Sequence, residues 1–67
     1  MNRKEIVKEI YNTAIEAGFT VKQYSRHDLV LQPKTDEQVA VAIKLMEKYS
    51  DIGFLDGWRF NLSIRRF

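Results

Sequence analysis

The 67-residue sequence contains no cysteine and only one histidine, one proline and one tryptophan. Without cysteine no disulfide framework can form, and a structural zinc site would lack its usual thiolate ligands. The single histidine is His27, and the loop acids Asp51 and Asp56 lack the spaced carboxylates of a calcium loop. We therefore expect no metal and no cofactor, and a fold that depends on its aliphatic and aromatic residues alone.

Long hydrophobic runs are also absent. No apolar stretch approaches the roughly 20 residues that a membrane-spanning helix needs. The chain begins MNRKEIVKEI, which indicates a charged helix rather than a signal peptide. We expect a complete, cytoplasmic gene product that makes no membrane contact. The length permits one compact domain, residues 1–67, and a domain this small buries only about 60% of its unfolded surface.

Charge of one sign is scarce, because eleven Lys and Arg residues oppose nine Asp and Glu residues, for a net charge of +2. This balance is unlike that of a histone-like protein. The excess lies at the end of the chain, where Arg59, Arg65 and Arg66 outnumber Asp56 and contribute +2.

Two segments have the periodicity of amphipathic helices. The first, residues 2–17, repeats apolar residues at helical spacing, with Asn2 as its cap and Gly18 as its stop. The second follows a capping box formed by Thr35 and Gln38 and should end near Ser50.

Alternation of apolar and polar residues predicts three strands. Residues 19–32 read as two strands joined around Ser25–Arg26 and ended by Pro33. Residues 58–65 read as one further strand with a buried face of Trp58, Phe60, Leu62 and Ile64.

The order α-β-β-α-β predicts an α+β fold, with two helices packed on one face of a three-stranded mixed sheet. The last strand could pair in parallel with the second, or antiparallel with the first. The second arrangement is slightly favoured, because it lets both helices cover one face.

Catalytic motifs are absent, with no nucleophile elbow, P-loop or dinucleotide fingerprint. We therefore do not expect an enzyme. One stretch, AGFTVKQYSRHDLVL, resembles the opening of HicA-type toxins, which cleave messenger RNA. Gly18, Phe19, Ser25 and His27 occupy similar places, although Arg26 separates the Ser and His that are adjacent in that family. The resemblance implies a ribonuclease in which His27 is the general acid or base, against the plainer interpretation of a solvated hairpin residue.

The outward face of the predicted sheet is basic and polar, which suits phosphate binding and base stacking. As an RNA- or DNA-binding module, the chain would use Lys22, Arg26, Arg59 and Arg65. An ordinary solvated face explains the same alternation.

The loop at residues 52–58 concentrates large apolar residues. We expect Phe54 and Trp58 to close the open end of the core, and Leu55 to be more available. The leading prediction is a non-enzymatic protein that binds another protein, as adaptor or inhibitor, of the kind that phages and mobile elements encode. Its predicted contact residues are Leu55, Arg59, Arg65 and Tyr24. The edge of the last strand could also form a homodimer.

Overall fold

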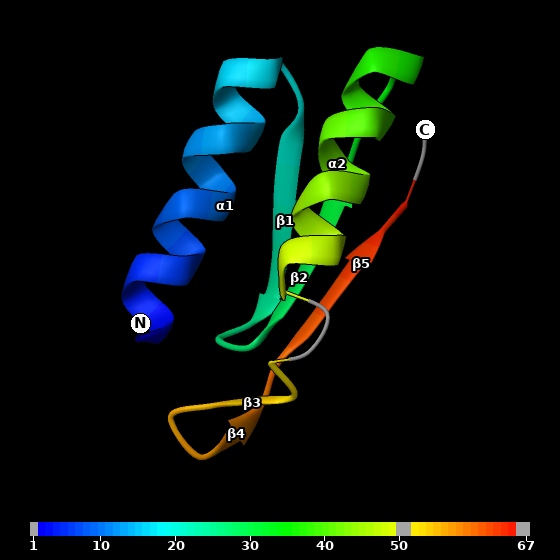
Figure 1. The fold of residues 1–67 in the computed structure, drawn as a ribbon. Coiled ribbons are helices and arrows are strands. Elements are labelled where there is room, and N and C mark those ends of the chain that lie inside the picture. The colour runs from blue at the N-terminus through cyan, green and yellow to red at the C-terminus, as the bar shows by residue number, and fades with distance from the viewer. Residues whose placement is uncertain (1, 50–51, 66–67) are drawn as a thin grey trace.

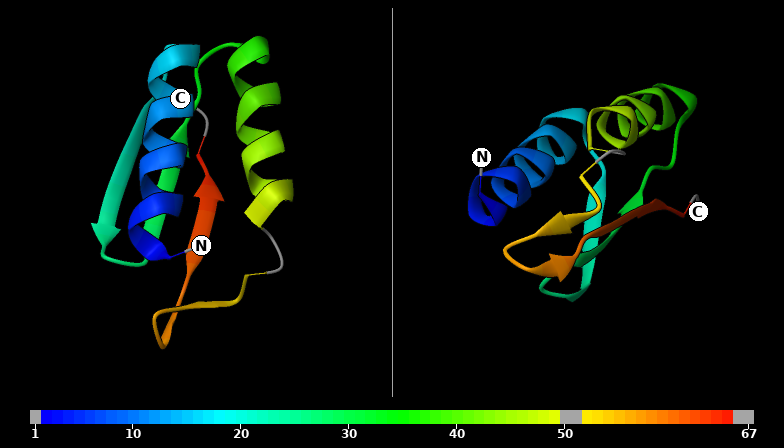
Figure 2. Two further views of the ribbon diagram at one scale, coloured as in Figure 1. Left: turned by 60° about the vertical axis from the view of Figure 1, so that its left-hand side comes forward. Right: turned by 60° about the horizontal axis from the view of Figure 1, so that its bottom comes forward.

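The computed structural model describes residues 2–49 and 52–65. The elements, in chain order, are α1 (Arg3–Ala17), β1 (Thr20–Ser25), β2 (Asp28–Gln32), α2 (Asp36–Tyr49), β3 (Phe54–Leu55), β4 (Trp58–Arg59) and β5 (Asn61–Ile64). Both helices lie on the same face of the three-stranded sheet, which confirms the predicted α+β fold (Figures 1 and 2). No helix in these two ranges is long and apolar enough to cross a membrane.

Helix α1 begins and ends where its sequence predicts. The Asn2 side chain accepts a hydrogen bond from the backbone N–H of Glu5 at 2.9 Å. Gly18 closes the helix with a left-handed backbone, at a φ of 91°. The buried stripe of Ile6, Ile10 and Ala14 faces the sheet and α2.

A side-chain junction joins the end of α1 to the start of α2. The Gln38 side-chain oxygen accepts from the backbone N–H groups of Lys34 and Thr35, at 2.8 and 3.3 Å. Its amide nitrogen donates to the carbonyl oxygens of Ala17 and Gly18, at 3.4 and 3.2 Å. The Thr35 hydroxyl accepts from the Gln38 N–H at 3.1 Å, which completes the predicted capping box.

The sheet has the order β1-β2-β5, with β1 and β2 antiparallel and β2 and β5 parallel. The favoured prediction, antiparallel pairing of the last strand with the first, is therefore wrong. The reason lies in β2, whose run Leu29-Val30-Leu31 is apolar on both faces and suits a central strand. Leu29 and Leu31 face the helices and are fully buried.

The core lies between the sheet and the two helices. Its buried members are Ile6, Ile10, Ala14, Phe19, Leu29, Leu31, Ala42, Leu45, Tyr49 and Phe60. An exposed ion pair between Lys48 and Glu9 joins the outer sides of the two helices.

The predicted strand at residues 58–65 divides into two elements, β4 and β5. Asn61 pairs with Asp28, the first residue of β2, so the sheet offers no partner to residues before Asn61. The chain instead folds back on itself, and Trp58 pairs with Leu55 across a two-residue turn. Both turn residues, Asp56 and Gly57, have positive φ angles, of 51° and 81°, which is typical of a type I′ hairpin.

Candidate binding surfaces

The β3–β4 ribbon carries two aromatic side chains that the core leaves in solvent. Phe54 is 69% exposed and Trp58 is 66% exposed. The prediction that these two residues close the core is wrong. Leu55 is half-buried and packs against the core instead. Because cross-strand partners share a face, Leu55 and Trp58 occupy one face of the ribbon, and Phe54 and Arg59 occupy the other.

Trp58 is held against the turn that joins β1 and β2. Its ring stacks on His27, with the ring centroids 6.2 Å apart and the planes at 27°. His27 is half-buried, and its Nε2 atom is buried with no hydrogen-bond partner among the described residues. The predicted solvated position of His27 is therefore wrong. Arg26, the neighbouring turn residue, is exposed.

We call the surface formed by Phe54, Trp58 and Arg59 of the ribbon, with Arg26 and His27 of the turn, the aromatic tip. It lies at the end of the molecule where the β1–β2 turn and the ribbon come together (Figure 1). The backbone carbonyl of Arg26 accepts a hydrogen bond from the Arg3 guanidinium at 2.6 Å, which ties the turn to the start of α1.

Ser25 and His27 are close in the chain, but their contact runs through the backbone. The Ser25 hydroxyl accepts from the His27 backbone N–H at 3.3 Å, while the imidazole ring lies against Trp58. After the hairpin the chain enters α2, where the resemblance to HicA-type toxins implies a third strand. A catalytic role for His27 stays a prediction.

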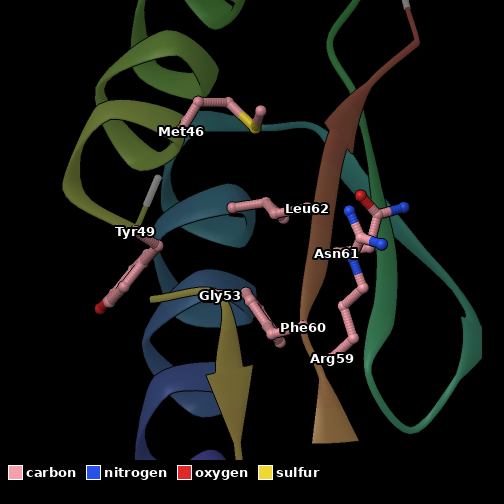
Figure 3. Close-up of a pocket in the computed structure, with 7 residues that line it drawn as sticks. All are labelled: Met46, Tyr49, Gly53, Arg59, Phe60, Asn61 and Leu62. Carbon is pink, nitrogen blue, oxygen red and sulfur yellow. The ribbon is translucent and has the colours of Figure 1, made fainter. Parts of the chain in front are cut away.

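A hollow lies beneath the C-terminal end of α2, next to Gly53 (Figure 3). Met46, Phe60 and Leu62 reach toward it from the helix side of β5, whereas Arg59 and Asn61 extend on the opposite side of the strand. The mostly apolar lining offers little for chemistry, but it shows that Met46 lies over β5.

The face of the sheet that the helices leave uncovered has the predicted alternation. We call it the open face, and it is formed by Thr20, Lys22, Tyr24, Asp28, Val30, Gln32, Asn61, Ser63 and Arg65. Val30 at its centre is only 9% exposed, because β1 and β5 flank it with Lys22 and Ser63.

Polar contacts order this face. The Lys22 ammonium lies 5.2 Å from the centre of the Tyr24 ring. The Asn61 amide donates to the Asp28 carboxylate at 3.0 Å. The one acidic group on the open face therefore already has a partner.

The structure divides the predicted contact residues between two surfaces. Arg26 and Arg59 lie at the aromatic tip, while Lys22, Tyr24 and Arg65 lie on the open face. Arg66 falls outside the described residues. The two exposed aromatics of the ribbon were missing from the predicted contacts, although the Asp56–Gly57 pair is a strong hairpin signal that could have indicated them.

Comparison with models of known protein families, with curated proteins and with solved structures finds no match.

Proposed function

We propose that this protein is a small non-enzymatic binding protein that recognises a partner protein through the aromatic tip. The observation that carries the proposal is the exposure of Phe54 and Trp58 on one short ribbon, each by about two thirds of its surface. Large exposed aromatic side chains beside arginine are typical of the residues that dominate protein interfaces.

The ribbon is also held in place before binding. Its type I′ turn fixes the backbone, and the stack on His27 restricts the Trp58 ring. The Gly53 carbonyl accepts from the N–H of Phe60, a buried core residue, at 2.9 Å, which anchors the ribbon to the domain. A preorganised anchor loses little conformational entropy on binding.

The charges around the tip indicate what the partner surface offers. Arg26 and Arg59 border the two aromatic rings, with Asp56 alone opposing them in the turn. We therefore expect a partner with an apolar pocket for Trp58 and acidic groups at its rim, since complementary potentials favour the correct encounter.

The test compares partner capture by the wild type with capture by Trp58→Asp and Phe54→Asp. Ile15→Asp is the matched control, because Ile15 is 70% exposed but lies near the end of α1. We expect both tip variants to lose the partner and the control to retain it, with unchanged circular dichroism. For the milder Trp58→Ala, a loss of about 2 kcal/mol, typical of an interface hot spot, would raise Kd roughly 30-fold.

Two results would contradict the proposal. One is capture that both tip variants leave unchanged. The other is capture that Ile15→Asp abolishes equally, which would indicate adhesion to any exposed apolar side chain.

A second candidate function, nucleic-acid binding, is favoured by the open face. Lys22 and Arg65 present two cations there, and Tyr24 is 53% exposed. If this face binds phosphates, affinity should fall steeply between about 50 and 200 mM salt, and removing both cations should reduce the salt slope by about two contacts. Undetectable binding at the lower salt would eliminate this function.

A further inference from the structure

The outer edge of β5 has unused backbone groups. The N–H groups of Asn61 and Arg65 donate to the His27 and Leu31 carbonyls, at 2.7 and 2.8 Å. Because backbone direction alternates along a strand, the N–H and C=O groups of Leu62 and Ile64 point away from β2. Among the described residues, no strand pairs with that edge.

The opposite edge of the sheet differs in a telling way. Strand β1 carries Lys22, and its register with β2 shifts at a bulge between Gln23 and Ser25. Lysine and bulges are devices that protect an edge against further strand pairing. Strand β5 has neither, because Asn61–Ile64 contains no Lys or Pro and keeps an unbroken register with β2.

An apolar strip of α2 runs beside the unprotected edge. Met46 lies over β5, and Ile43 and Val39 lie three and seven positions earlier, on the same side of the helix. Lys48, which bonds Glu9 of α1, marks the opposite side of α2. Ile43 is 44% exposed, so the strip is open to a partner.

We propose that a second copy of this chain pairs with the β5 edge in a two-fold symmetric, antiparallel arrangement. The two sheets then form one continuous six-stranded sheet, with both α2 strips on the same face and close to the symmetry axis. A symmetric dimer requires a self-complementary patch, and β5 has one in the register that places Ser63 opposite Ser63 of the second copy.

In that register Leu62 lies opposite Ile64 of the second copy, and the two residues exchange both backbone hydrogen bonds. Symmetry repeats the pair, so all four outward N–H and C=O groups of each strand are satisfied. The side chains of Leu62 and Ile64, half-buried in the monomer, then cover each other on the helix side.

The charges agree with the same register. Arg65 lies opposite Asn61 of the second copy and not opposite another cation. That asparagine already bonds Asp28 on its own sheet, so Arg65 reaches toward an acidic group one strand farther away. Each protomer supplies one such arginine and one such aspartate, which makes the contact reciprocal.

Antiparallel pairing puts the two aromatic tips at opposite ends of the joined sheet. Dimer formation therefore does not depend on the proposed function, and it leaves both tips accessible. Either proposal can fail while the other holds, because the dimer is measured with the purified chain alone.

The first test measures the solution mass of the wild type over a range of concentrations by sedimentation equilibrium. We expect a species of twice the 7.9 kDa monomer. Leu62→Pro should dissociate it at least tenfold more readily, because the substitution removes an outward N–H group and leaves the β2 ladder intact. Ile43→Asp, on the α2 strip, should weaken the dimer in the same direction, whereas Ile15→Asp should not.

The second test reads the register and does not depend on how Leu62→Pro folds. The chain has no cysteine, so Ser63→Cys introduces a single thiol. In a non-hydrogen-bonded antiparallel pair the two Cα atoms lie about 4.5 Å apart, which a disulfide can bridge. Under mild oxidation Ser63→Cys should form a covalent dimer at least tenfold faster than Lys22→Cys on the β1 edge. A wild type that stays monomeric, or equal rates for the two variants, would overturn the proposal.

Discussion

Gln38 offers a sharp test of how this small domain is held together. Its side chain uses the oxygen to cap α2 and the amide nitrogen to bond the last carbonyls of α1. Replacing it with alanine removes four hydrogen bonds at once, while the helix keeps a residue of high propensity. Gln38→Glu separates the two roles, since it keeps the oxygen acceptor and loses the nitrogen donor.

The expected magnitude follows from the geometry. A net hydrogen bond contributes about 0.5–1.5 kcal/mol, and the two longest of these four, from Thr35 and to Ala17, belong at the low end. We expect Gln38→Ala to lower the free energy of unfolding by about 2 kcal/mol, and Gln38→Glu by about half of that. For a domain of this size, 2 kcal/mol corresponds to a fall in Tm of roughly 10–15 °C.

Gly18 allows a double-mutant cycle with Gln38. A Cβ at Gly18 would lie 3.3 Å from the Gln38 side-chain nitrogen, on a backbone with a φ of 91°. Gly18→Ala should therefore cost less in the Gln38→Ala background, where only the backbone strain remains. Urea denaturation followed by circular dichroism measures all four proteins. A loss below about 0.5 kcal/mol for Gln38→Ala, the range of an ordinary surface substitution, or a strictly additive cycle, would refute this account.

Three further predictions concern the core, the helix pair and the ribbon. Leu29→Ala, at a fully buried site of the central strand, should cost about 2–5 kcal/mol and leave the domain largely unfolded, as heat denaturation would show. Glu9→Gln should cost less than about 1 kcal/mol in urea denaturation, because the Lys48–Glu9 pair is exposed. His27→Ala should make the single tryptophan more accessible to acrylamide quenching, whereas His27→Phe, which retains a stacked ring, should not.

The helices were predictable because their signals are local. Asn2 and Thr35 place a hydrogen-bonding side chain at each helix start, and Gly18 permits the left-handed backbone at the end of α1. The second half of the Gln38 contact was not predictable. Its donors reach Ala17 and Gly18 across 20 residues of sequence, and only the packing of α1 against α2 brings these groups together.

Strand order depended on a weaker signal. Alternation showed which residues of β5 face the core, and Leu62 and Ile64 do so. It could not show which strand β5 joins, because either edge would bury the same face. The decisive feature was Val30, since a third apolar residue between Leu29 and Leu31 indicates a strand with neighbours on both sides.

The limit of β5 was set by its partner and not by its own sequence. The alternation from Trp58 to Ile64 continues without interruption, yet only residues from Asn61 onward find a strand beside them. The chain before that point could pair only with itself. The Asp56–Gly57 turn made this pairing favourable, and it carried Trp58 away from the core.

The position of these aromatics has an energetic consequence that supports the binding proposal. Full burial of a side chain as large as phenylalanine is worth about 1.5–3 kcal/mol, and small domains have a total stability near the lower end of 5–15 kcal/mol. Leaving both Phe54 and Trp58 about two thirds exposed therefore forgoes a large part of the stability that this chain could have. Ile15 is equally exposed, but it is a single residue on a helix, as on most protein surfaces. Two preorganised aromatic rings on one ribbon are better explained by a surface that is buried when a partner binds.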